Sequence, residues 1–191
     1  MSEVLLQPTT RYRHDRDVQF VTTIMQGFFS QSHVKNRLDA LRTLQVSNVE
    51  RWLQVEMALY FQESDSVAMW ERELPLQVET AKKGATARAR IIPDFVLMQA
   101  GLRSEDRVIL EVKANVTDAH ACLNGLCKDH AKYRHQRHEL FGNVSSLLLV
   151  GLHPKPSAET NDWLWKNHNM CISSQPIRST RLHFSVSHIF S

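Results

Sequence analysis

The sequence has little of what marks secreted, fibrous or disordered chains. Only 3 of its 191 residues are cysteine, 6 are glycine and 6 are proline. Three cysteines are a small and odd number, which does not suit a disulfide framework. The cysteine content therefore predicts a reducing compartment. The composition shows no collagen-like, disordered or low-complexity segment, and no internal repeat or linker stands out.

Long hydrophobic runs are also missing. Nothing in the chain approaches the roughly 18 uninterrupted apolar residues of a membrane span. The short apolar run near the N-terminus is interrupted by Gln7 and Pro8 and is too short for a signal peptide. A P-loop is absent as well, so the chain has no motor of its own. We therefore expect a soluble, cytoplasmic protein without a membrane partner.

The residues that are present predict a compact domain. Hydrophobic residues make up 42% of the chain and charged residues 23%, which is enough to bury a core without disulfides or structural metal. We expect a single domain over residues 1–191. It would consist of a helical segment over about 1–46, a core over about 47–151, and a C-terminal helix and strand over 152–191.

Hydrophobic periodicity predicts two helical regions before the first strand. Residues 15–44 carry apolar side chains at helical spacing, with a break at Gly27 or at Ser30 to Ser32. A second helix would begin with the capping box of Ser47 and Glu50 and run to about Glu63, because Ser and Glu at this spacing satisfy each other's backbone N–H groups.

The rest of the chain predicts strands and two further helices. Residues 67–79 alternate in polarity and are followed by a turn-forming, basic stretch; two more strand-like runs, RIIPDFVLMQ and RVILEVKA, complete a three-stranded meander. A helix from Thr117 or Asp118 to about Phe141, the buried strand VSSLLLVGL, a helix over 157–167 and a last strand over 181–190 follow. This order predicts an α/β fold, a mixed central sheet flanked by helices.

Three ionisable residues stand where a sheet core normally holds valine or isoleucine. Asp94 follows Pro93 inside an apolar run, and Glu111 and Lys113 lie two apart in the next one. Residues two apart in a strand point to the same face, and pairing of the two runs as a hairpin would bring Asp94 beside Glu111. Two buried carboxylates imply a cation between them or a raised pKa. Carboxylates with a few waters suit Mg²⁺, and Mn²⁺ could substitute for it.

The segment IPDFVLMQAGLRSEDRVILEVKAN resembles the core motif of the PD-(D/E)xK nuclease superfamily, which has the restriction-endonuclease-like fold. In that family a Pro-Asp on one strand precedes a Glu-x-Lys on the next. The resemblance covers about residues 47–151. It implies that Asp94 and Glu111 are metal ligands, that the carbonyl of Val112 is a further ligand, and that Lys113 is the catalytic lysine.

Members of this superfamily often add a glutamate from a helix that precedes the sheet. Glu56 fits that role best, because it interrupts the apolar stripe of the second helix and should point toward the sheet. Glu73 is the alternative, whereas Glu50 is expected to cap the helix. RecB-like relatives carry a Gln four residues before a Tyr in the later helix; here Asp129 precedes Tyr133, which weighs against that branch.

Basic residues cluster in two segments that could contact a phosphate backbone. The formal net charge is +3, a balance that allows a polyanionic partner without requiring one. On the second segment, His130 and Tyr133 are expected to pack over the sheet near the active site. The residues predicted to bind nucleic acid are Lys82, Lys83, Arg88 and Arg90 in the first segment, and Lys132, Arg134 and Arg137 in the second.

Two alternative interpretations involve the same residues. Asp94, Glu111 and Lys113 could form a salt-bridge ladder on a half-exposed sheet. The stretch CLNGLCKDHAKYRHQRH could suggest zinc, but Cys122 and Cys127 fall on different faces of one helix and no CxxC knuckle is present.

The predicted function is a Mg²⁺-dependent DNA nuclease, an endonuclease of restriction, repair, recombination or transposition. RNA is the alternative substrate. The resemblance further implies two paired sites in a homodimer or a larger partner subunit. A noncatalytic nucleic-acid or protein-binding module is the alternative from another class, disfavoured because both carboxylates and the lysine are present.

Overall fold

The computed structural model describes residues 8–82, 85–103, 106–134, 144–168 and 172–188. Its helices are α1 (Pro8–Ser30), α2 (Ser32–Thr43), α3 (Val49–Glu63), α4 (Ala119–Arg134) and α5 (Ala158–His168). The predicted break between the first two helices is confirmed at Gln31. Among the described helices, none combines the length and the apolar character that crossing a bilayer requires.

Six strands form the central sheet, in the order β1-β4-β5-β6-β8-β7. Strands β5 and β6 are parallel and joined through α4, and the other neighbours are antiparallel. This arrangement confirms the predicted mixed α/β sheet flanked by helices. The strands of this sheet are β1 (Val67–Arg72), β4 (Phe95–Gln99), β5 (Arg107–Ala114), β6 (Val144–Pro154), β7 (Ser174–Pro176) and β8 (Leu182–His188).

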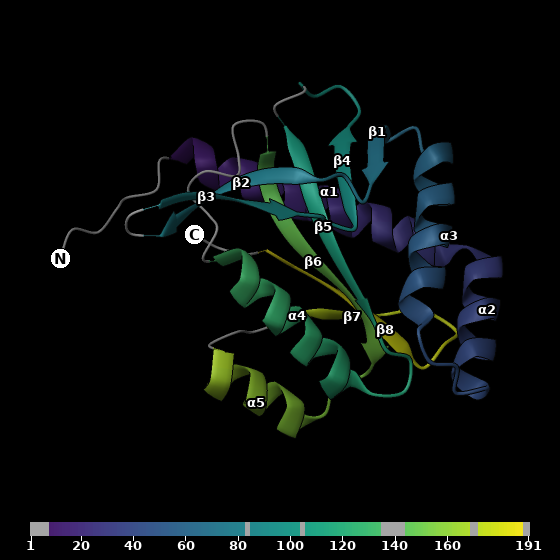
Figure 1. Cartoon of the computed structure of the whole chain (residues 1–191). Helices are drawn as coiled ribbons and strands as arrows, with labels where there is room; N and C mark the ends of the chain where they lie inside the picture. Colours follow the sequence, from purple (N-terminus) through teal and green to yellow (C-terminus); the bar gives the residue numbers. More distant parts are fainter. Residues whose placement is uncertain (1–7, 83–84, 104–105, 135–143, 169–171, 189–191) are drawn as a thin grey trace.

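Helices cover both faces of the sheet (Figure 1). Helices α1, α2 and α3 bury apolar side chains on one face together with Val108, Leu110 and Val112 of β5. Helices α4 and α5 pack on the other face, where Ile109 of β5 joins the core. Because strand side chains alternate, Glu111 and Lys113 share the face of Ile109 and project toward α4.

The stretch between β1 and β4 differs from its prediction. The predicted strand over 67–79 is interrupted at Glu73, whose φ of 53° turns the chain before Pro75. The predicted turn is instead part of a separate hairpin of β2 (Leu76–Lys82) and β3 (Ala85–Ile91). The hairpin projects away from the body of the protein (Figure 1). The predicted meander is therefore formed by β1, β4 and β5, with the hairpin inserted into it.

The predicted capping box at the start of α3 is wrong. Asn48 occupies the N-cap position in a left-handed conformation, with a φ of 60° and no side-chain cap hydrogen bond. The carboxylate of Glu50 is thereby available to groups outside its own helix. By contrast, Asp118 caps α4 as expected, since its Oδ1 accepts a hydrogen bond of 3.0 Å from the backbone N–H of Ala121.

Candidate active site

The predicted site forms where β4 separates from β5. The two strands pair as far as Phe95 and Leu110, so the next residues, Asp94 and Glu111, lie opposite each other. Asp94 stands in the bend before β4 and not inside a strand as expected. Its Oδ2 accepts a hydrogen bond of 2.7 Å from the backbone N–H of Val112. The Asp94 carboxylate thus accepts a hydrogen bond from the β5 backbone just beyond the last residue of β5 that pairs with β4.

Asp94 and Glu111 form a carboxylate pair in which Glu111 is buried and Asp94 is half-buried. Their side chains are hydrogen-bonded to each other, and Glu111 is only 5% exposed. Burial raises the pKa of both groups. Repulsion from Asp94 and Asp129 adds to the rise at Glu111, whose pKa reaches about 7, whereas the hydrogen bonds from Val112 and Glu111 act against the rise at Asp94. One proton shared between two carboxylates explains this behaviour, because both cannot ionise at short range without a cation.

Neutral donors hold each carboxylate in place. The phenol of Tyr133, which is 2% exposed, donates a hydrogen bond to Oε1 of Glu111. The amide of Gln54 donates to Oδ1 of Asp94 at 2.7 Å, and its own oxygen accepts from Arg72 at 3.1 Å. Helices α3 and α4, packed on opposite faces of the sheet, therefore both orient the pair.

Lys113 is held between the same two helices. Its Nζ lies 3.4 Å from Oε1 of Glu50 on α3 and 3.2 Å from Oδ2 of Asp129 on α4. Burial disfavours the ammonium, but attraction to Asp129, Glu50 and Asp94 outweighs burial and raises the pKa of Lys113. Gly125 lies against the lysine stem, since a Cβ there would approach Lys113 Cδ to 3.2 Å. The lysine therefore keeps its charge beside the carboxylate pair.

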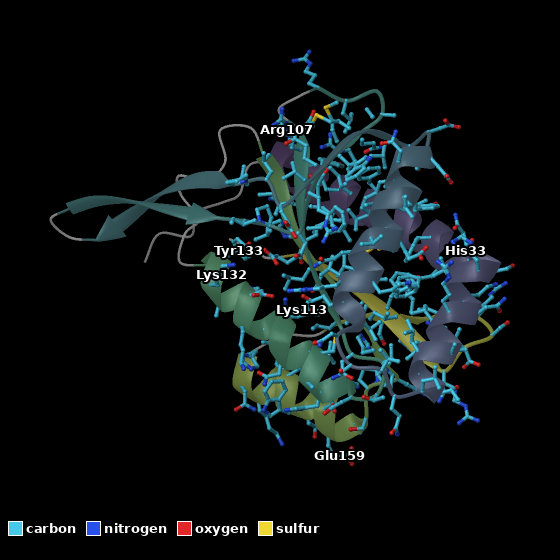
Figure 2. All side chains as sticks on the ribbon, turned by 45° about the vertical axis from the view of Figure 1, so that its right-hand side comes forward. His33, Arg107, Lys113, Lys132, Tyr133 and Glu159 are labelled. Carbon is cyan, nitrogen blue, oxygen red and sulfur yellow. The ribbon has the colours of Figure 1, made fainter. Side chains whose placement is uncertain are left out.

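Glu56 is not part of this cluster, and the prediction that it points toward the sheet is wrong. It is 8% exposed, and its carboxylate pairs with Arg37 and lies 3.7 Å from Nε2 of His33, both on α2. Figure 2 shows His33 well separated from Lys113 and Tyr133. The physical reason is helical phase: Glu56 lies two residues after Gln54, which places it on a different side of α3.

Two other predicted positions lie at the margin of the site. The side chain of Glu73, the alternative to Glu56, is 65% exposed and lies 3.4 Å from Arg72. Its backbone N–H donates to the backbone oxygen of Asp94 at 3.3 Å. Val112, whose carbonyl the resemblance implies as a ligand, has a fully buried side chain between the two site residues of β5.

The predicted nucleic-acid contacts fall on two elements. Lys82, Arg88 and Arg90 belong to the β2–β3 hairpin, and Arg134 ends α4. Lys83 and Arg137 lie outside the described residues. Lys132 is exposed, with its Nζ 4.7 Å from the centre of the Tyr133 ring.

His130 is half-buried on α4, as its expected packing near the site implies. Figure 2 shows Lys113, Lys132 and Tyr133 on the side of the body from which the hairpin projects.

The comparisons with known proteins give no family. No family model, no curated protein and no solved structure matches this chain. Membership of the PD-(D/E)xK superfamily therefore stays a prediction, and the function has to be inferred from the geometry of the site.

The donor set fits a hard divalent cation. Three carboxylates, of Glu50, Asp94 and Asp129, attract the ammonium of Lys113, and Glu111 is hydrogen-bonded to Asp94. In the described part of the chain, no three His, Cys, Asp or Glu side chains form a metal-holding group. Asp94 and Glu111 alone would leave most of the coordination shell of an ion to water, an arrangement that Mg²⁺ tolerates.

The cysteines of α4 do not favour the zinc alternative. Burial raises the pKa of Cys122 to about 12 and that of Cys127 to about 11. Zinc binds the thiolate form, so both thiols would have to lose a proton inside the core. Their burial is better explained by packing between α4 and the sheet.

Sequence reasoning missed Glu50, Gln54 and Asp129. A usable signal was present: Glu50 and Gln54 are four apart on α3, and Asp129 and Tyr133 are four apart on α4, so each pair shares one helix face. Glu50 was assigned to helix capping, and Asp129 was only compared with the glutamine of RecB-like relatives. Neither residue was therefore considered as a partner of Lys113.

Proposed function

We propose that this protein is a Mg²⁺-dependent endonuclease that hydrolyses phosphodiester bonds in DNA. The observation that carries the proposal is the Asp94–Glu111 carboxylate pair next to the ammonium of Lys113. A structural ion pair would join one carboxylate to one cation. Here two carboxylates face each other while the nearby cation is bound by two others, Glu50 and Asp129, an arrangement suited to a ligand that carries positive charge.

Each residue has a defined task in this proposal. Asp94 and Glu111 would hold the metal ion, oriented by Gln54, Val112 and Tyr133. A bound Mg²⁺ would polarise the phosphate and lower the pKa of a bound water.

Lys113 remains an ammonium and would stabilise the negative charge that gathers on the phosphate in the transition state. Glu50 and Asp129 would keep that ammonium aimed at the phosphate by their ion pairs.

The test is cleavage of supercoiled plasmid DNA by the purified protein with Mg²⁺, with Mn²⁺ and with EDTA. Glu111→Gln and Lys113→Met should each reduce metal-dependent cleavage by at least about 100-fold. Asp162→Asn, an exposed position on α5, is the matched control and should cleave like the wild type. Failure of the wild type to cleave with either metal, or cleavage that persists in EDTA, would refute the proposal.

A further inference from the structure

The β2–β3 hairpin holds an unusual share of the positive charge. Its sequence, residues 76–91, contains four lysines and arginines and one glutamate, so it carries a net +3. The whole chain also has a formal net charge of +3. The remainder of the protein is therefore neutral by this count, and the hairpin alone gives the molecule its basic character. Such a concentration of charge favours a polyanionic partner.

Strand register divides the hairpin into two unlike faces. Leu76 pairs with Ile91, Val78 with Ala89 and Thr80 with Ala87, so one face holds small and apolar residues. Gln77 pairs with Arg90, Glu79 with Arg88 and Ala81 with Thr86, so both arginines share the opposite face. Lys82 belongs to the first face by the same register. Arg88 and Arg90 thus occupy register positions on the same face of the two-stranded ribbon.

The hairpin is attached at the catalytic aspartate. Glu73 precedes β2 and Asp94 follows β3, and the hydrogen bond of 3.3 Å from the Glu73 N–H to the Asp94 oxygen closes the base. Leu74 and Leu76 pack on the apolar cluster that contains Tyr133, which is on the α4 face of the sheet. The ribbon therefore leaves the body beside the candidate active site (Figures 1 and 2).

The dimensions of the ribbon fit one form of nucleic acid. Strands of seven residues extend about 20 Å. The major groove of B-form DNA, about 12 Å wide, admits a two-stranded ribbon. The major groove of A-form RNA is too narrow and deep for side chains to read. Arginines at register positions on one face match the guanine edges and phosphates that a ribbon in the DNA groove would meet.

We infer that the β2–β3 hairpin is an arm that lies in the major groove of duplex DNA, with the face of Arg88 and Arg90 toward the DNA, and so delivers the backbone to Asp94. This inference rests on the proposed function, since it names double-stranded DNA as the substrate of the same site. It can be tested separately because groove binding requires neither metal nor cleavage.

The experiment measures binding of the full chain to fluorescent 30-base-pair probes by anisotropy, in EDTA, over a series of salt concentrations. The probes are duplex DNA, the same strand alone, and duplex RNA. We expect the tightest binding to duplex DNA. Arg88→Gln with Arg90→Gln should weaken that binding by about tenfold or more and lower the salt slope by about two, because each lost phosphate contact releases one counterion fewer.

Two controls remove positive charge from other parts of the protein. Lys155→Gln with Lys166→Gln takes two exposed positive charges from the body and should leave affinity and salt slope unchanged. Lys82→Gln takes one charge from the opposite hairpin face and should cost less than Arg88→Gln. Equal losses from Lys82→Gln and Arg88→Gln would overturn the assignment of the arginine face to the DNA.

Groove occupancy is tested with modified duplexes. Bulky substituents on pyrimidine C5 project into the major groove and should weaken binding, whereas a ligand that fills the minor groove should not compete. Equal affinity for duplex RNA, or unchanged affinity of the Arg88→Gln/Arg90→Gln protein, would overturn the inference even if the wild type cleaves DNA. Hairpin-dependent duplex binding without metal-dependent cleavage would refute the proposed function and leave the inference standing.

Discussion

Two buried carboxylate clusters lie on the central sheet of this protein, and they are built differently. Asp17 of α1 is 1% exposed and accepts hydrogen bonds of 2.9 and 2.8 Å from the guanidinium of Arg16 and one of 2.7 Å from Ser146 of β6. At the candidate active site, the hydrogen bonds to Asp94 come from neutral groups of Gln54 and Val112, and the opposing group is another carboxylate, Glu111.

The difference distinguishes a structural cluster from a binding cluster. Asp17 has its own cation, so its burial is compensated inside the protein and it fixes α1 to the sheet. Asp94 and Glu111 have raised pKa values because cations of the protein compensate their burial and negative charge only in part. A cation from solution could supply the missing charge at this site.

Removing one negative charge should therefore have opposite effects in the two clusters. Asp17→Asn removes the charge of the carboxylate that accepts two hydrogen bonds from Arg16, which keeps its contact of 3.3 Å with Asp106, and should lower the free energy of unfolding by about 3 kcal/mol. Glu111→Gln removes the repulsion with Asp94 and places an amide donor beside that carboxylate, so stability in EDTA should hold or rise. Urea unfolding of both variants and the wild type at neutral pH measures the two changes. The comparison fails if Glu111→Gln is the more damaging substitution.

The stability of the metal-free protein should depend on pH through Glu111. Its pKa is about 7 in the folded state against 4.5 for an ordinary glutamate, so between these values the folded protein holds a proton that the unfolded chain has lost. The free energy of unfolding should then fall as pH rises from about 4.5 to about 7, by about 3 kcal/mol, and stay level above.

Glu111→Gln cannot titrate and isolates this contribution. Unfolding in EDTA at about pH 5 and pH 7.5 should show a smaller pH-dependent loss for the variant than for the wild type. Mg²⁺ should stabilise the wild type more at the higher pH, where the carboxylates are ionised and ready to bind it. Identical pH slopes for both proteins would mean that Glu111 titrates normally.

Substitutions of Glu50 and Glu56, both on α3, should have clearly different effects on cleavage. Glu50→Gln removes one of the two carboxylates that hold Lys113, and cleavage should fall by about tenfold, mainly in kcat, with partial recovery in Glu50→Asp. Glu56→Gln disturbs a contact with α2 and should cost at most about 1 kcal/mol of stability. Its cleavage rate should match the wild type. A larger activity loss from Glu56→Gln would restore the sequence-based assignment.

The smallest effect is expected at Gly125. In Gly125→Ala the new Cβ would lie 3.2 Å from Lys113 Cδ, so the lysine stem must shift by a few tenths of an ångström. We expect a loss of cleavage of about threefold with no loss of stability, since alanine favours a helix by about 1 kcal/mol over glycine. Thermal unfolding and initial cleavage rates measure the two effects. An unchanged rate would show that the lysine adapts without cost.

Much of the fold was predictable because it depends on local patterns. Helical periodicity located α1 to α5, although α1 begins at Pro8 and not near residue 15, and the predicted end of α4 at Phe141 lies outside the described residues. The apolar run of β6 marked a strand buried on both faces. The hairpin was missed for a physical reason. Strand β3 alternates alanine with threonine and arginine, β2 ends in Thr80, Ala81 and Lys82, and strand formation there depends on the pairing of the two strands with each other. Such a segment carries no core-facing alternation that a sequence pattern could reveal.

The site was predictable in part. Asp94, Glu111 and Lys113 were found because ionisable residues interrupt apolar strands, and the strand register does bring Asp94 beside Glu111. Glu56 was chosen over Glu50 because Glu56 interrupts the apolar stripe of the helix and Glu50 was assigned to capping. Which of the two reaches the site depends on the angle at which α3 crosses the sheet. That angle is set by packing against α1 and β5, which no local pattern contains.

Local sequence was enough to identify which groups could do chemistry here: two carboxylates and a lysine within apolar runs, where a spacing of two places Glu111 and Lys113 on one face in any sheet. Tertiary structure decided which of the remaining ionisable groups join them. Helical phase and packing gave Glu50 and Asp129 to Lys113, Glu56 to Arg37, and Tyr133 to Glu111. The periodicity of a strand is local and survives any arrangement of the domain, whereas contacts between helices on opposite faces exist only once the core that separates them is packed.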